Sequence, residues 1–312
     1  MNSTINQLPP QSVLIGVGLL AAAALAVVLT LVSKEQVFGR QVSERRARTP
    51  STPLTDLIAV FGGCVLVGAM MSRLFWVVLA PSVDLGLVWQ HPWAIFDPRH
   101  GGHSSFGALV GAVVVIGLWI RASFQAGRDV RAPAVQAKLA GVDVLVAGGL
   151  GGLALARLGC LANGCDFGKA TDLAWAIRHS PGTDAFQAHL ERGWVGVDAA
   201  WSATVHPFAL YLVVGTVLIV VWAAWAIATR ALRPGRVAIW ASGAYLLMRF
   251  ISEWTRDEAT VLHMGAGLNI HHVMAVVGLG VLVAARRWLD TCEANVAESS
   301  SRRASQSTYG QQ

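Results

Sequence analysis

Charged residues are scarce in this 312-residue chain: 13% are Asp, Glu, Lys or Arg, whereas 54% are hydrophobic. Soluble domains carry about twice that share of charge, so the composition excludes a soluble globular protein. The apolar runs lack the strict alternation of barrel strands, which argues against a membrane β-barrel. Only four cysteines are present and they make no disulfide framework, although Cys160 and Cys165 are close enough to raise the question of a bond. We therefore predict an all-α polytopic membrane protein.

Seven apolar runs have about the length of a helix that crosses a bilayer. They fall at 13–32, 54–79, 104–120, 139–156, 208–228, 237–253 and 268–285. We expect a seven-helix membrane domain over 13–292, preceded by an outer tail at 1–12 and followed by a disordered cytoplasmic tail at 293–312. The connection at about 162–206 is too long for a turn and too mixed to span, which predicts a small extracytoplasmic head.

Basic residues predict the orientation of these helices. Of the 24 Lys and Arg residues, 16 fall in one set of connections, at 34–48, 121–138, 230–236 and 286–303. The excess of Lys and Arg marks the cytoplasmic side, so the N-terminus is predicted outside and the C-terminus in the cytoplasm. The same bias explains the net charge of +6, and no nucleic-acid partner is expected. The first run has no charged n-region and a basic stretch follows it, which favours a retained helix over a cleaved signal peptide.

The segment Arg157–Gly168 is the first candidate site. Arg157 ends an apolar run, where an arginine is costly unless it meets an anion. The residues after it let the backbone approach closely and supply amide groups; they are Gly159, Asn163, Gly164 and Gly168. Two thiols, Cys160 and Cys165, share the loop. In the alternative interpretation, Arg157 extends to the membrane interface and the glycines only end a helix.

Other polar residues at the ends of the apolar runs are further candidates. Arg73 lies in the second run, and Arg249 is four residues before Glu253, so the last two can pair on one helix face. His103 follows paired glycines at the start of the third run, and imidazole is a common general base. Two simpler interpretations stay open: Arg73 reaches the interface, and Arg249 with Glu253 is a structural ion pair.

These residues also carry a resemblance. The run from Arg157 through Asn163, Gly164, Gly168 and Thr171 to Trp175 resembles the signature of the prolipoprotein diacylglyceryl transferases. Further blocks of that family occur in the same order: Arg73-Leu74, Pro92–Phe96, Gly101-Gly102 with the Gly107 helix, His206-Pro207 with Leu210-Tyr211, and Arg249 with Glu253 and Arg256.

The resemblance implies a multi-pass protein of the bacterial cytoplasmic (inner) membrane whose active site lies near the outer face and needs no cofactor or metal. The implied reaction moves the diacylglyceryl group of phosphatidylglycerol to the lipobox cysteine in the signal peptide of a prolipoprotein and releases glycerol 1-phosphate. Its partners are thus phosphatidylglycerol, prolipoproteins and membrane lipids. The implied catalytic residues are His103, Arg157 and Arg249; the implied substrate-binding residues are Arg73, Asn163, Gly164, Gly168, Tyr211, Glu253 and Arg256.

The sequence departs from the family pattern at several positions that bear on the chemistry. Nothing in 13–32 matches the Arg-Trp-Tyr-Gly-like motif of the first helix. The family's histidine falls on Phe106, its first signature asparagine on Cys160, and its glutamate on Cys165, with Asp166 beside it. Three alternatives therefore remain: transfer to another acceptor at the same lipid-phosphate site, a catalytically silent lipid binder, and a thiol or metal protein built on Cys160, Cys165, His100 and His103.

Overall fold

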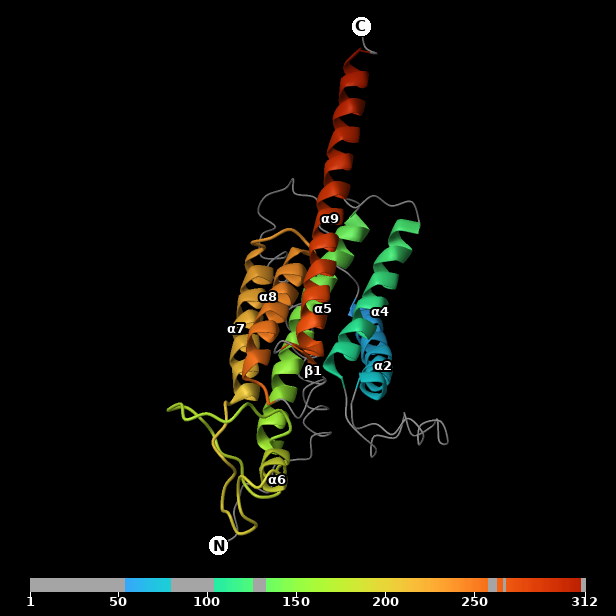
Figure 1. Ribbon diagram of the computed structural model, residues 1–312. Coiled ribbons are helices and arrows are strands. Elements are labelled where there is room, and N and C mark those ends of the chain that lie inside the picture. Colours follow the sequence, from blue (N-terminus) through green and yellow to red (C-terminus); the bar gives the residue numbers. More distant parts are fainter. Residues whose placement is uncertain (1–53, 80–103, 126–132, 258–262, 266–267, 310–312) are drawn as a thin grey trace.

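The computed structural model describes residues 54–79, 104–125, 133–257, 263–265 and 268–309. The predicted helix at 13–32 lies outside these ranges, as do His100 and His103. Within them the chain is mostly helical, with one small antiparallel sheet formed by β1 (His263–Gly265) and β2 (Leu268–Asn269) (Figure 1).

The long helices follow the apolar runs. They are α2 (Leu54–Leu79), α4 (Ser105–Gln125), α5 (Pro133–Asn163), α7 (Phe208–Thr229), α8 (Arg236–Ser252) and α9 (Ile270–Tyr309). Among the described helices, α2, α5, α7 and α9 are long and apolar enough to cross a membrane. The protein is thus a helical, multi-pass membrane protein, while the seven spans and the orientation of the termini stay predictions. Helix α9 continues to Tyr309, past the start of the tail that we expected to be disordered at 293.

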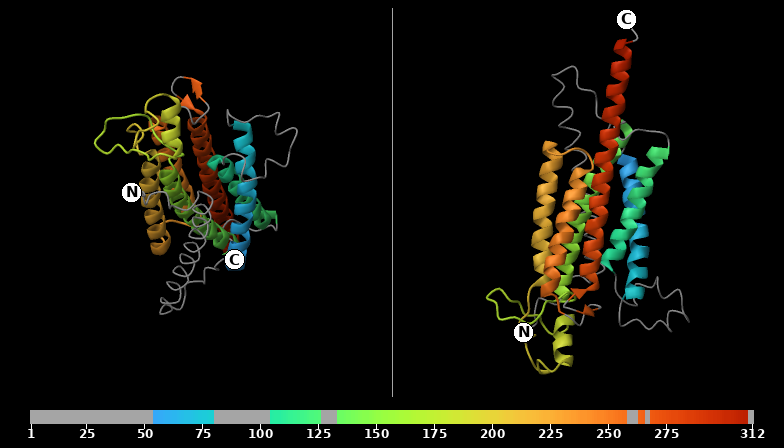
Figure 2. Two further views of the ribbon diagram at one scale, coloured as in Figure 1. Left: turned by 90° about the horizontal axis from the view of Figure 1, so that it is seen from below. Right: turned by 45° about the horizontal axis from the view of Figure 1, so that its top comes forward.

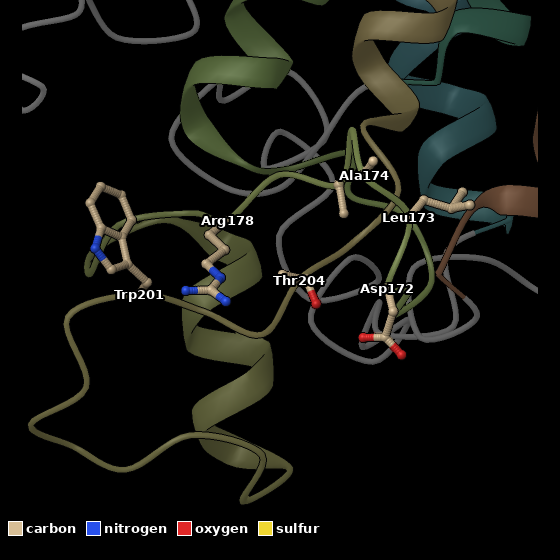
Figure 3. Close-up of a pocket in the computed structure, with 7 residues that line it drawn as sticks. Asp172, Leu173, Ala174, Arg178, Trp201 and Thr204 are labelled. Carbon is tan, nitrogen blue, oxygen red and sulfur yellow. The ribbon is translucent and has the colours of Figure 1, made fainter.

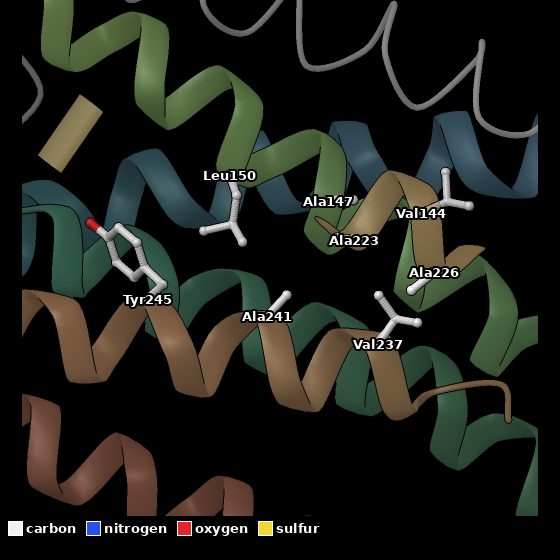
Figure 4. Close-up of a cluster of buried hydrophobic side chains, with 8 residues drawn as sticks. All are labelled: Val144, Ala147, Leu150, Ala223, Ala226, Val237, Ala241 and Tyr245. Atoms are coloured by element: carbon white, nitrogen blue, oxygen red, sulfur yellow. The ribbon is translucent and has the colours of Figure 1, made fainter. Parts of the chain in front are cut away.

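Small side chains hold the helices together. Helices α5, α7 and α8 meet in a core that contains four alanines; its residues are Val144, Ala147, Leu150, Ala223, Ala226, Val237, Ala241 and Tyr245 (Figure 4). Helices α2 and α4 pack through glycine, since a Cβ on Gly107 would lie 2.3 Å from the carbonyl oxygen of Met71. Lipid supplies no hydrophobic drive between helices, so close backbone approach of this kind stabilises the bundle.

A buried carboxylate in α5 caps the start of α8. Asp143 Oδ2 accepts a hydrogen bond from the Gly235 amide at 2.8 Å, and Oδ1 accepts one from the Ala238 amide at 2.7 Å. The first amides of a helix have no partner within it, and the helix dipole favours a negative charge there. Asp143 thereby fixes the N-terminus of α8 against α5.

The segment between α5 and α7 forms a head at one end of the bundle. It contains the short helix α6 (Asp184–Glu191), whose first turn is capped by Thr183 Oγ1 accepting from the Phe186 amide. Phe167, Ala185 and Val205 form its small core. The C-terminal part of α9 projects from the opposite end of the bundle (Figures 1 and 2).

Candidate functional site

Three arginines gather at the end of the bundle that carries the head. Arg157 lies in the last turns of α5, Arg249 in the last turn of α8, and Arg256 just after the 3₁₀ helix η3 (Glu253–Thr255). All three are buried, with 7%, 1% and 9% of their surface exposed. We call these residues, with Asp166 and Glu253, the arginine cluster.

The two carboxylates of the cluster alternate with the arginines. Asp166 accepts from Arg157 and, at 2.7 Å, from Nη2 of Arg256. Glu253 Oε1 lies 2.5 Å from Nη2 of Arg249 and 3.5 Å from Nη1 of Arg256. The Asp166–Arg256 ion pair joins segments ninety residues apart in the chain, because Asp166 follows α5 whereas Arg256 follows α8 and η3.

Helix α9 completes the cluster. Asn269, directly before α9, donates from Nδ2 to Oε2 of Glu253 at 2.9 Å. His271 places Nδ1 3.4 Å from Oε1 of Glu253 and 2.9 Å from Nη1 of Arg256. Glu253 therefore connects α8 with the start of α9.

Two glycines bring the Asp166 loop to this place. Gly164 has a φ of +63°, which lets the chain turn back at the end of α5. Gly168 donates from its amide to the His206 carbonyl at 3.2 Å, and Lys169 donates to the Thr255 carbonyl at 2.8 Å. A Cβ on Gly168 would lie 2.5 Å from the His206 oxygen, so only glycine allows this approach.

The cluster has an excess of positive charge and of hydrogen-bond donors. Three guanidinium groups face two carboxylates. Within the described residues, the Nε of each arginine and the Nη1 of Arg249 are buried and have no hydrogen-bond partner. The ring of Phe208 lies 5.2 Å from the guanidinium carbon of Arg249 and 5.5 Å from that of Arg256. Buried cationic donors need a partner, so this arrangement is suited to bind an anion.

The structure thus brings together Arg157, Arg249, Glu253 and Arg256, four of the residues that the sequence singled out. Gly164 and Gly168 shape the loop, and Asn163 is the last residue of α5. The amide of Cys165 donates to the Cys160 carbonyl at 3.3 Å, and the two thiols are not joined in a disulfide.

Two further candidates, Tyr211 and Arg73, make other contacts in the structure. Tyr211 accepts a hydrogen bond from Nε1 of Trp175 at 2.8 Å and lies 3.2 Å from Nδ1 of His206, so it joins α7 to the head. Arg73 is buried on α2. In the described ranges, no group of three or more His, Cys, Asp or Glu side chains is arranged to hold a metal; the metal alternative also needs His100 and His103, which lie outside them.

The head carries a pocket that is separate from the arginine cluster. Its volume is about 610 Å³, and it is lined by Asp172, Leu173, Ala174, Ala176, Arg178, Trp201 and Thr204 (Figure 3). None of these residues belongs to the arginine cluster. Elsewhere on the head, Arg192 pairs with Asp257, and these hydrogen bonds raise the pKa of Arg192.

A bundle of apolar helices that buries a net positive cluster beside a polar head defines a class: a multi-pass membrane protein with a site for an anionic group. The comparison with known families is more specific. The family model of the prolipoprotein diacylglyceryl transferases matches residues 13–285, and the chain belongs to this family.

Several curated relatives carry the name phosphatidylglycerol–prolipoprotein diacylglyceryl transferase. The protein of Leifsonia xyli subsp. xyli is 29% identical over 232 residues, which are 70% of this chain and 61% of the relative. The protein of Polynucleobacter necessarius subsp. necessarius is 28% identical over 219 residues (69% and 68%), and that of Geobacter sulfurreducens is 29% identical over 208 residues (66% and 65%). The chain therefore spans between 61% and 68% of the length of these relatives.

Proposed function

We propose that this protein transfers the diacylglyceryl group of phosphatidylglycerol to the lipobox cysteine thiol of a prolipoprotein and releases glycerol 1-phosphate. The observation that carries the proposal is the buried arginine cluster, with its excess of one positive charge and its unpartnered donors. Family membership and the names of the relatives favour the same reaction.

The arginine cluster fits the lipid phosphate. Guanidinium groups match phosphate oxygens in geometry and charge, and Arg157, Arg249 and Arg256 are held in place by Asp166 and Glu253. Phosphatidylglycerol is an anion whose headgroup lies at the membrane surface. In the proposed topology the head marks the outer face of the bacterial cytoplasmic membrane, so the site would meet lipids of the outer leaflet.

The chemistry requires the same charges. The sulfur of the acceptor attacks the glycerol carbon bonded to the phosphate, the new S–C bond forms, and the C–O bond breaks with its electron pair on the phosphate oxygen. The phosphate gains a second negative charge as it departs, and fixed cationic donors stabilise that charge in the transition state. The thiol proton goes to a base. The sequence predicts His103, which lies outside the described residues; His271 is the second candidate.

The test is transfer of labelled diacylglycerol from phosphatidylglycerol to a lipobox peptide, measured in membranes that contain the wild type or one variant. Arg157→Lys and Arg249→Lys keep the positive charge but lose the planar guanidinium group that can donate two parallel hydrogen bonds to a phosphate. Each should lower the rate of transfer by about a hundredfold. Arg178→Lys on the exposed head is the matched control and should stay near wild type.

Two results would contradict the proposal. Wild-type protein that folds but transfers nothing would exclude this reaction; if it still bound phosphatidylglycerol, a different acceptor or a silent lipid binder would remain. Equal rates for the wild type and both lysine variants would show that the arginine cluster is not the phosphate site.

A further inference from the structure

His271 stands out because it contacts both a carboxylate and an arginine of the arginine cluster. Its Nδ1 lies 2.9 Å from Nη1 of Arg256 and 3.4 Å from Oε1 of Glu253. Its backbone amide donates to Oδ1 of Asn269 at 3.0 Å, which anchors the residue at the start of α9. The side chain keeps 18% of its surface exposed, whereas the Glu253 side chain is enclosed. The imidazole of His271 is thus partly accessible, whereas the carboxylate of Glu253 that it contacts is fully buried.

The neighbours of the ring restrict what it can do. On one face it stacks on Phe106 of α4, with ring centres 5.2 Å apart and planes 18° from parallel. Phe106 is buried and carries no charge. The charged groups that face the ring are Glu253 and Arg256, with Arg249 behind Glu253. One face is covered and Nδ1 is occupied, so Nε2 is the nitrogen left for a substrate.

The two contacts of Nδ1 act in opposite directions. Arginine can only donate, so while Arg256 bonds to Nδ1 the neutral ring holds its hydrogen on Nε2. When a phosphate oxygen accepts from Arg256 instead, Nδ1 can carry the hydrogen and direct it at Glu253. Nε2 is then left with a lone pair. Binding of the anion would therefore favour the tautomer that can accept a proton.

We propose that His271 accepts the proton of the attacking thiol, through Nε2, in the transfer reaction. This inference rests on the proposed function and gives the role of base to a residue of α9 in place of His103. The S–H bond breaks as the N–H bond forms, the sulfur electrons form the S–C bond, and the proton later passes to the departing phosphate or to water. Glu253 stabilises the imidazolium that forms.

The experiment compares two acceptor peptides that differ in one atom. One carries the lipobox cysteine, and the other carries selenocysteine, whose selenol is already ionised near pH 7 and needs no base. Transfer of labelled diacylglycerol from phosphatidylglycerol is measured at pH 7 with full-length wild type, His271→Gln and His103→Gln. Glutamine reaches the position of Nε2 but does not titrate. General-base catalysis contributes about 100-fold or more, so His271→Gln should lose about that factor with the cysteine peptide and less than about fivefold with the selenocysteine peptide.

The ratio of the rates with the cysteine and the selenocysteine peptide distinguishes loss of the base from distortion of the site, because a distorted site slows transfer to both peptides alike. An equal loss with both peptides, or a selective loss of the thiol reaction in His103→Gln instead, would overturn the inference and leave the proposed function intact. Wild type that transfers to neither peptide would overturn both. If His271→Gln does not fold, the same ratio measured on His271→Asn decides the question.

Discussion

Arg192 and Asp257 form a two-bond ion pair, with Nη1–Oδ2 at 2.9 Å and Nη2–Oδ1 at 2.6 Å. Arg192 follows α6 in the head, and Asp257 follows Arg256 of the arginine cluster. The amide of Asp257 also donates to the carbonyl of Phe167, the neighbour of Asp166, at 3.2 Å. Asp257 therefore links the head to the residue next to Arg256 and to the residue next to Asp166, so the head contacts the neighbours of both partners of this ion pair.

Loss of the Arg192–Asp257 ion pair should slow the proposed diacylglyceryl transfer, although neither residue belongs to the arginine cluster. Replacing Arg192 with Gln breaks the two-bond pair, and a displacement of about 1 Å at Arg256 is enough to lower the transfer rate by about ten- to a hundredfold. The rate is measured in the membrane assay. Arg178→Gln, at an exposed arginine of the same head, is the control, and an equal effect of the two changes would argue against a positioning role.

Gly168 should tolerate no side chain. In Gly168→Ala the new Cβ would lie 2.5 Å from the His206 carbonyl oxygen and 2.8 Å from that of Thr255, both backbone atoms that cannot move aside cheaply. We expect a loss of about 1–3 kcal/mol in stability and reduced transfer. Thermal unfolding in detergent measures the first. Gly196→Ala, where a Cβ meets nothing within 4 Å, should unfold like the wild type; a normal melting temperature for Gly168→Ala would refute the packing argument.

The sequence predicts the helices well and the site in part, for different physical reasons. An apolar run of about twenty residues can satisfy its backbone in lipid only as a helix, so the six runs from 54 onward match described helices. The Arg249–Glu253 pair follows from i,i+4 spacing. Arg157 is identifiable because a charge at the end of an apolar run needs a partner.

Arg157 pairs with Asp166, nine residues further along the chain, but the contacts that complete the site cannot be predicted from spacing. Asp166 meets Arg256 across ninety residues, and His271 meets Phe106 across a still longer separation. Contacts between distant segments leave no local period in the sequence. Asp143 reads only as a charge within an apolar run, and its role as a cap for α8 appears when the Gly235 turn is placed beside it. Tyr211 belongs to the family pattern, and the hydrogen bond that its hydroxyl group accepts from Trp175 of the head could not be predicted from the sequence.

Acid should destabilise the head. Burial and the neighbouring His189 lower the pKa of His179 to about 4, so the folded head holds this imidazole neutral. An unfolded histidine has a pKa of about 6.5 and takes up a proton first. The stabilising contribution is therefore complete above about pH 6.5 and is lost as the pH falls toward 4, by about 3 kcal/mol.

Hydrogen exchange of the head between pH 7 and 4, corrected for the intrinsic rate, measures this loss. The Trp194 ring, centred 5.0 Å from that of His189, gives a fluorescence signal for the same transition. His179→Gln should flatten the pH dependence. If protection of the head amides from hydrogen exchange stays constant down to pH 4 in the wild type, the expected destabilisation by acid is wrong.

Removal of the Asp143 cap should weaken the bundle at the end away from the arginine cluster. Asp143→Ala leaves the amides of Gly235 and Ala238 without their acceptor, at a cost of about 1–3 kcal/mol. Thermal unfolding in detergent should show a lower midpoint, while the rate of transfer below that midpoint stays near wild type. Asp143→Asn keeps an oxygen acceptor and should lose less. A midpoint equal to that of the wild type in Asp143→Ala would exclude the capping role.

The arginine cluster draws on the end of α5, the end of α8 and the start of α9, which has consequences for biosynthesis. When the chain has emerged from the ribosome only as far as Ser252, Arg157, Asp166 and Arg249 are available at the membrane, but Glu253, Arg256, Asn269 and His271 are not. The half-made protein would hold two arginines against a single carboxylate, and the site would come into being only when the final helix enters the bilayer. Translation thus sets the earliest moment at which all residues of the arginine cluster are present.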